Sequence, residues 1–323
     1  MSPTLKKIIS YIIPPVITVG LCYVLYADVD MASVLAGARR CNPLLVALFL
    51  ACNVLAMILR GYRWRLQLRA IGVNPGVGVM SRSIFGTYAV NLVFPRLGEF
   101  WRCAYIARVK ETPFSGVFGT MVADRLSDTL MVALICLPTF IASSSALSRF
   151  LASANVPVGA LTSWTLWILL GLCAIGALYV IYGKGALARK VRDFCLKTWR
   201  GFLVIFRMPR RLTWLLLTLG IWGSYILSMG LSMLAFPPTA ELAATHGAAC
   251  VMVTFVFGSL AMAIPSNGGI GPWQFAIILS LSGLYALPRE EALVFATLNL
   301  GATTLLTILL GLYAFLHISL RKT

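Results

Sequence analysis

Charged residues are scarce in this chain. Only 11% of its 323 residues are Asp, Glu, Lys or Arg, whereas 59% are hydrophobic. Soluble domains carry roughly twice that charged fraction. Several apolar segments also reach the ~20 residues that a helix needs to cross a bilayer. The composition therefore excludes an ordinary soluble domain and predicts an all-α integral membrane protein.

Residues that bind metals or cofactors are also few. The two histidines, His246 and His317, stand alone, and the eight cysteines are scattered without metal or redox spacing. The sequence contains no hydrolase, phosphate-loop or nucleotide fingerprint. We therefore expect no metal, no cofactor and no catalytic residues.

Acidic residues are outnumbered, with 10 of them against 27 Lys and Arg, giving a net charge of +17. The basic residues lie mostly in short connections between apolar segments, which is the positive-inside pattern and not a nucleic-acid motif. One cytoplasmic connection is predicted to hold Arg60, Arg63, Arg65 and Arg69. We expect a multi-pass protein of the cell (inner or cytoplasmic) membrane, with both termini in the cytoplasm.

The apolar segments divide into full and broken ones. Six segments are long enough to cross the membrane: about 8–26, 43–60, 113–142, 162–182, 212–236 and 291–318. Two further regions are interrupted. "NLVFPRLGEFWR" at 91–102 breaks the apolar region from Ser83 to Val109, and "PSNGGIGPWQ" breaks the one from His246 to Ala286. Each piece is too short to cross alone, so each pair predicts a re-entrant helical hairpin.

The order of these segments predicts a single transmembrane domain over 1–323, built as an inverted-topology repeat. Its halves would cover about 5–142 and 160–320, an arrangement typical of secondary transporters. An irregular bundle with two kinked helices, or eight full crossings, are the alternatives. Apolar residues at helical spacing over about 185–207, opposite a basic face, predict an interfacial amphipathic helix.

A cluster of ionisable residues surrounds the first break. A charge at membrane depth costs about 2.5–3.5 kcal/mol on insertion scales, so it normally faces a partner or a wet cavity. Either these charges pair to hold the fold, or they form a binding site. In the second case Arg96 and Arg125 bind an anionic headgroup, while the carboxylates orient them or accept protons. The cluster comprises Arg96, Glu99, Arg102, Asp124, Arg125 and Asp128.

The second break is rich in glycine. Gly268, Gly269 and Gly271 permit left-handed backbone and close approach of a ligand. The following helix, beginning near Pro272, would point free amides into a cavity and seat an anion facing the arginines. A glycine cluster used for packing is the alternative. With the polar residues of both breaks, Asn91, Asn267 and Gln274, these positions complete the candidate substrate-binding set.

At both breaks the sequence resembles a known family. "NLVFPRLGEFWRCAYI", "VFGTMVADRLSDTL" and "AIPSNGGIGPWQ" look like the flippase-like transmembrane domain of lysylphosphatidylglycerol synthases, and the similarity spans about residues 5–318. The resemblance implies a helical bundle with two re-entrant hairpins that moves a lipid headgroup, such as aminoacylated phosphatidylglycerol, between leaflets. Trp273 and Gln274 stand where the family often carries a glutamate. The synthase domain is absent, so lysyl transfer is not expected.

Three functions follow as hypotheses. The first is a lipid flippase-like transporter for an anionic or aminoacylated phospholipid, or for a polyprenyl-phosphate-linked lipid. The second is a membrane transferase acting on a lipid-linked donor, with Asp124 or Glu99 as base. The third is a non-transporting partner subunit of a membrane enzyme. In each case the partners are membrane lipids and not nucleic acid, and a homo-oligomer is an option.

Overall fold

The computed structural model describes residues 31–143, 210–264 and 266–320, together with positions 185, 192–193, 196, 199 and 208. Within these ranges every regular element is a helix. The helices are α2 (Met31–Arg40), α3 (Pro43–Ala70), α4 (Val77–Val93), α5 (Leu97–Val109), α6 (Phe114–Ala142), α10 (Arg211–Ala235), α11 (Pro237–Ala261), α12 (Pro272–Ile278) and α13 (Arg289–Leu320). A π-helical turn, η2 (Leu279–Leu284), extends α12.

Five of the described helices, α3, α6, α10, α11 and α13, are long and apolar enough to cross a membrane. The predicted spans 43–60, 113–142, 212–236 and 291–318 fall on α3, α6, α10 and α13. The predicted spans 8–26 and 162–182 lie outside the described residues, as does most of the predicted amphipathic helix 185–207. The all-helical, multi-pass membrane architecture is therefore confirmed, whereas six crossings stays a prediction.

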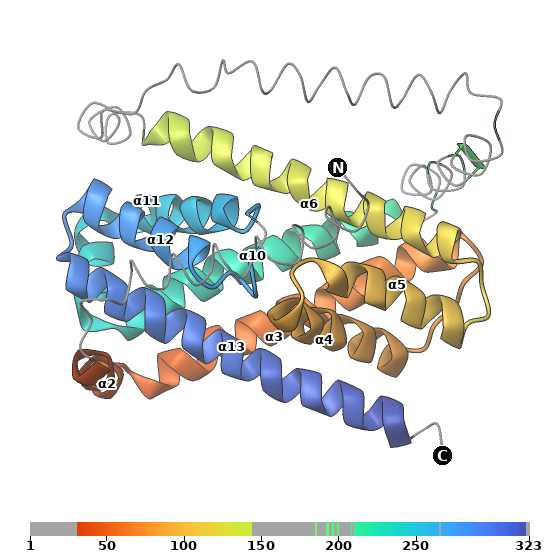
Figure 1. Ribbon diagram of the computed structural model, residues 1–323. Coiled ribbons are helices and arrows are strands. Elements are labelled where there is room, and N and C mark those ends of the chain that lie inside the picture. The colour runs from red at the N-terminus through yellow and green to blue at the C-terminus, as the bar shows by residue number, and fades with distance from the viewer. Residues whose placement is uncertain are drawn as a thin grey trace.

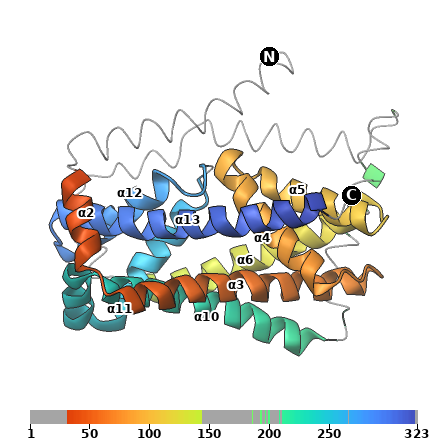
Figure 2. The same cartoon turned by 90° about the horizontal axis from the view of Figure 1, so that it is seen from below.

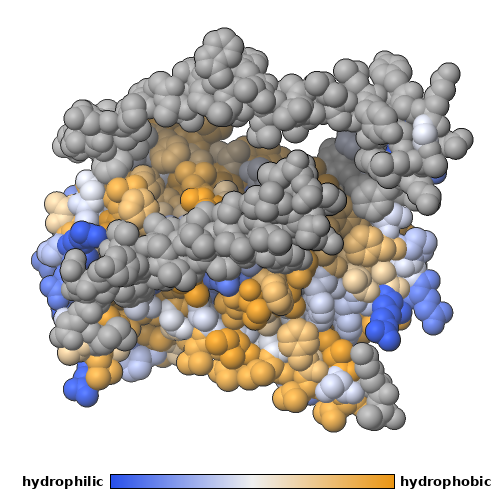
Figure 3. Space-filling view, in the orientation of Figure 1, coloured by the Kyte–Doolittle hydropathy of each residue, from blue (hydrophilic) through white to orange (hydrophobic). Residues whose placement is uncertain are grey.

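The outer faces of the long helices are apolar. On α6, for example, Leu126, Leu130, Leu134 and Leu137 recur every three or four residues and are all exposed. In the space-filling view, hydrophobic residues predominate in the coloured part of the middle, and hydrophilic residues gather at the left and right ends (Figure 3). An apolar band between two polar ends is the surface expected of a protein that spans a bilayer.

Helix α3 is longer than the sequence predicts. It begins at a capped turn, where the Asn42 side chain accepts hydrogen bonds from the amides of Leu44 and Leu45. It then continues ten residues beyond the predicted end at 60. Arg60 and Arg63 are consequently buried inside the bundle, and their assignment to a connection between spans was wrong. Carboxylates on α6 form ion pairs with both arginines, so these charges can be buried within a continuous helix.

Two helical hairpins approach each other from opposite ends of the bundle. Helices α4 and α5 are 17 and 13 residues long, pack together, and are joined by a turn at residues 94–96. Helix α11 is interrupted at Gly247 (φ 63°, ψ −153°), so its second part, residues 248–261, pairs with α12 and η2. In two views α4 and α5 lie near one end, and α11 and α12 near the other (Figures 1 and 2).

Each hairpin has its own apolar core. Trp64, Ile84 and Ile106 belong to the cluster that joins α4 and α5 to α3 and α6. Ile221, Ile277 and Phe295 belong to the cluster that joins α11 and α12 to α10 and α13. The order of long helix, hairpin and long helix thus occurs twice. The predicted inverted repeat itself stays a prediction, because the first span of each half lies outside the described residues.

Candidate functional site

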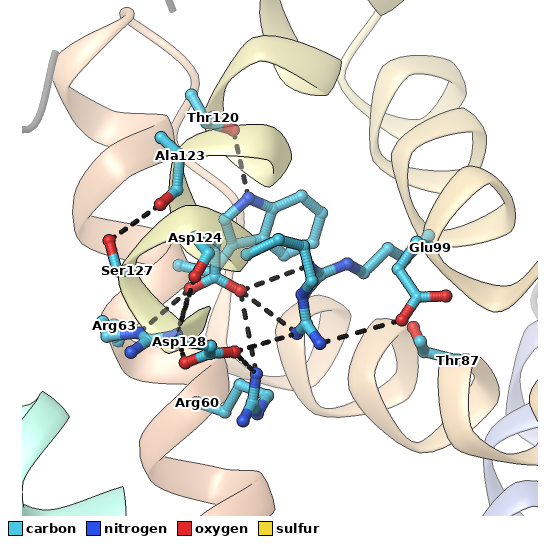
Figure 4. A network of polar contacts seen from close by, with 12 residues as sticks. Arg60, Arg63, Thr87, Glu99, Thr120, Ala123, Asp124, Ser127 and Asp128 are labelled. Carbon is cyan, nitrogen blue, oxygen red and sulfur yellow. Dashed lines mark hydrogen bonds and ion pairs between the residues drawn. The ribbon is translucent and has the colours of Figure 1, made fainter. Parts of the chain in front are cut away.

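Asp124, in the middle of α6, is the centre of a buried network of charges (Figure 4). Its side chain is fully buried. Oδ1 accepts hydrogen bonds from Nε and Nη2 of Arg63 at 2.9 and 2.6 Å. Oδ2 accepts one from Nη2 of Arg102 at 3.2 Å. A buried carboxylate is stable only with such partners, so Asp124 joins α3, α5 and α6.

Asp128 lies one turn further along α6 and extends the network. Its Oδ1 accepts a hydrogen bond from Nη2 of Arg63 at 2.7 Å, and its Oδ2 accepts one from Arg60. Arg63 therefore bridges both carboxylates. Arg60 also lies over the ring of Tyr225, whose hydroxyl is 3.1 Å from that of Tyr88. The network thus reaches α10 and α4 as well.

Arg125 forms the accessible edge of the network. Its side chain is 37% exposed, the most of the seven charged members. It lies 3.4 Å from Asp124, 3.6 Å from Asp128 and 3.7 Å from Oε1 of Glu99. Glu99, 18% exposed, connects this edge to the turn between α4 and α5.

The network carries an excess positive charge. Four guanidinium groups, on Arg60, Arg63, Arg102 and Arg125, face three carboxylates. Several of their N–H donors are buried without a hydrogen-bond partner, among them Nε and Nη1 of Arg102. Arg102 is held over the ring of Trp64 at 4.4 Å, a cation–π contact that compensates only part of its charge. An anion at the accessible edge would restore neutrality.

The turns of the two hairpins touch. Arg96, in the left-handed conformation (φ 62°), donates hydrogen bonds to the carbonyls of Met262 and Ala263 at 3.0 and 2.7 Å. The amide of Gly268 donates to the carbonyl of Asn91 at 3.1 Å. The Asn267 side chain donates to the carbonyl of Val93 at 3.4 Å. The structure therefore brings the two predicted breaks together.

Asn91 joins this contact to the network. Its side-chain oxygen accepts a hydrogen bond from the amide of Gly98 at 2.8 Å, and its nitrogen donates to Oε2 of Glu99 at 3.2 Å. Because Glu99 is also the partner of Arg125, one residue connects the turn of the second hairpin with the accessible edge of the network.

The glycine turn was predicted to seat an anion on free amides. Gly268, Gly269 and Gly271 do have positive φ, as expected. However, the amide of Gly268 donates a hydrogen bond to the carbonyl of Asn91, and the amide of Gly271 donates one to Oε1 of Gln274 at 3.1 Å. Gln274 is buried and caps α12. Arg96 likewise binds backbone carbonyls. These groups therefore serve the contact between the hairpins and the cap of α12, and anion binding at the turn stays a prediction.

Across the described residues, no three His, Cys, Asp or Glu side chains are grouped as metal ligands. A cavity of about 160 Å³ lies away from the charges, between α2, α3, α10 and α13, with a mostly apolar lining that includes Cys41, Phe49 and Phe236.

Comparison with known proteins decides the family. The model of the lysylphosphatidylglycerol synthase transmembrane region matches residues 11–311. This chain belongs to that family. A curated relative, the glycosyltransferase AglD of Haloferax volcanii, is 26% identical to the chain over 132 residues. The alignment covers 41% of this chain and 21% of AglD, so the chain spans only about a fifth of that relative's length. No solved structure matches the chain.

In this lysylphosphatidylglycerol synthase transmembrane region, sequence reasoning missed Arg60 and Arg63. Positive-inside counting assigned them to a loop, because they follow an apolar run. Their spacing of three residues, opposite two aspartates spaced by four on another apolar helix, is the pattern that would have found them. Tyr88 and Tyr225 could not be recognised as part of the network from the sequence, because tyrosine is common at membrane interfaces.

Proposed function

We propose that this protein moves an anionic lipid headgroup between the leaflets of the cell membrane. The substrate class is an anionic or aminoacylated phospholipid or a polyprenyl-phosphate-linked lipid. The observation that carries the proposal is the buried network with one excess positive charge and one exposed arginine. Membership of a family named for a lipid-modifying enzyme supports it.

The chemistry of the network favours a phosphate as ligand. Arg60, Arg63, Asp124 and Asp128 lie on helices long enough to span a membrane, where an uncompensated charge is costly. A phosphate at Arg125 would supply the missing negative charge. The planar guanidinium offers it two parallel hydrogen bonds, while the acyl chains remain in the bilayer.

The arrangement of the hairpins supports a transport mechanism. In the proposal, both hairpins are re-entrant, and six full helices surround them in an inverted repeat. The contact between their turns then closes the region beside Arg125 from one side of the membrane. Separation of the turns would expose the headgroup to the other side, which is alternating access around a fixed site.

Transport in reconstituted vesicles tests this proposal. Labelled phosphatidylglycerol and phosphatidylcholine are followed between leaflets with wild-type protein, Arg125→Gln, and the control Arg108→Gln. Arg108 is exposed near the end of α5. We expect Arg125→Gln to slow phosphatidylglycerol about tenfold, the loss that follows removal of one charge-assisted interaction worth ~1.5 kcal/mol. Equal rates for wild type and Arg125→Gln would refute the proposed site.

A transferase activity is the second candidate, because the AglD relative is named a glycosyltransferase. In that case Glu99 is the better base, since it is partly exposed, whereas Asp124 is held by several guanidinium groups. Incubation of purified protein with a lipid-linked sugar donor and acceptor decides the matter. Product that disappears in Glu99→Gln, with transport absent in wild type, would favour the enzyme.

A further inference from the structure

We infer that an anionic headgroup at Arg125 releases the contact between the two hairpin turns, because it competes with Glu99 for the guanidinium. Asn91 is the positioning residue that transmits the change. This inference rests on the proposed function, since it describes how the same site is regulated. It is argued from two hydrogen bonds, from the Gly268 amide to the Asn91 carbonyl and from the Asn91 side chain to Glu99, and from the ion pair between Glu99 and Arg125.

The pair between Arg125 and Glu99 is the most exposed ion pair in the network. Its two atoms are 3.7 Å apart and both side chains are partly exposed. By contrast, Arg63 and Asp124 are 2.6 Å apart and fully buried. Exposed ion pairs contribute little because water and salt screen them. An arriving phosphate therefore displaces Glu99 first and leaves the buried pairs intact.

Displacement of Glu99 acts on Asn91. The Asn91 side chain is held between the amide of Gly98 and Oε2 of Glu99, while its backbone carbonyl receives the amide of Gly268. The packing around it is tight, since a Cβ added to Gly98 would lie 2.2 Å from the carbonyl oxygen of Thr87. A shift of Glu99 consequently moves the peptide to which the second hairpin is bonded.

The turn itself is poised to change conformation. Arg96 holds a left-handed backbone that residues with a Cβ rarely adopt, while its side chain is bonded to Met262 and Ala263 of the other hairpin. Separation of the turns would free Arg96 to relax to an ordinary conformation. The closed and separated states thus differ in discrete contacts, and a ligand that binds one state better shifts the equilibrium.

Thiol cross-linking across the turns tests the inference. Val93→Cys and Asn267→Cys, in a protein without native cysteines, report the closed contact. The protein is placed in nanodiscs of phosphatidylcholine alone or with phosphatidylglycerol. We expect phosphatidylglycerol to slow cross-linking at least about fivefold, as a ligand with a modest preference for one of two states requires. A control pair, Ser33→Cys with Glu290→Cys, lies on α2 and α13 and should be unaffected.

Glu99→Gln separates this mechanism from a general loosening of the fold. The uncharged glutamine still accepts the hydrogen bond from Asn91 and is not repelled by a phosphate at Arg125, so cross-linking should stay fast in both lipids. Equal cross-linking of wild type in both lipids would overturn the inference. Equal slowing of wild type and Glu99→Gln would also overturn it, because the signal would not pass through Glu99.

Binding of phosphatidylglycerol, measured in parallel, separates this inference from the proposed function. If Arg125→Gln loses lipid binding while cross-linking of wild type is the same in both lipids, the proposed binding site stands and its coupling to the turns is refuted. Undiminished binding in Arg125→Gln refutes the site itself and the coupling with it.

Discussion

At the scale of single residues, burial divides the charged network into a structural part and a binding part. Asp124, Arg63 and Arg102 are fully buried, and both arginines donate hydrogen bonds to Asp124, so the three residues hold three helices together. Arg125 and Glu99 stand at the accessible edge and form the most exposed pair of the network. The two interpretations of the charges, scaffold and site, thus apply to different residues.

Asp124→Asn tests the structural part. Removal of one partner of a buried ion pair leaves uncompensated charges, and such changes typically cost about 3–5 kcal/mol. We expect a markedly lower midpoint of thermal unfolding in detergent. Glu241→Gln, at an exposed position of α11, is the matched control and should leave the midpoint unchanged. A wild-type midpoint for Asp124→Asn would show that the network does not stabilise the fold.

At the scale of elements, the first hairpin depends on a close approach of its two helices. Gly98 lies at the start of α5 against the backbone of α4, and an added Cβ would overlap the Thr87 carbonyl. The same approach brings Asn91 within reach of Gly98 and Glu99. The absence of a side chain at Gly98 therefore allows the close helix approach that positions Asn91 at the turn contact.

Gly98→Ala should separate α4 from α5. Overpacking of this kind costs about 1–3 kcal/mol, so we expect a lower unfolding midpoint and slower transport. Gly116→Ala is the matched control on α6, because its Cβ would meet Ile71 at an ordinary 3.7 Å. Equal stability of both variants would mean that the helices can shift apart without cost.

Sequence patterns predicted the elements better than the contacts between them. The interruptions around Pro95 and Gly269 located both turns, since proline, glycine and charge do not continue an apolar helix. The glycine turn was correctly given left-handed backbone, whereas the hydrogen bonds of its Gly268 and Gly271 amides were not anticipated. Their acceptors, the carbonyl of Asn91 and the side chain of Gln274, follow from tertiary packing and local capping that periodicity does not encode.

At the scale of the whole molecule, the two hairpins enter from opposite ends of one bundle (Figure 1). The long apolar helices and the family match establish a multi-pass membrane domain. Because α11 is also long enough to be counted as a span, its break at Gly247 decides whether it crosses or turns back. The membrane topology therefore remains a prediction that thiol labelling can test.

Cysteines at exposed positions near the open ends of the hairpins report that topology. Asn74→Cys precedes α4, and Ala244→Cys lies on α11 before its break. In cysteine-free protein in intact cells, we expect a membrane-impermeant thiol reagent to label Ala244→Cys and not Asn74→Cys. Permeabilised cells, in which both should react, are the control. Labelling of both in intact cells would contradict oppositely oriented hairpins.

The most direct test of the central claim is native mass spectrometry of gently extracted protein. The excess positive charge predicts that wild type retains an anionic lipid, that Arg125→Gln loses it, and that Arg108→Gln keeps it. Retention of the same anionic lipid by Arg125→Gln, at wild-type occupancy, would contradict the account.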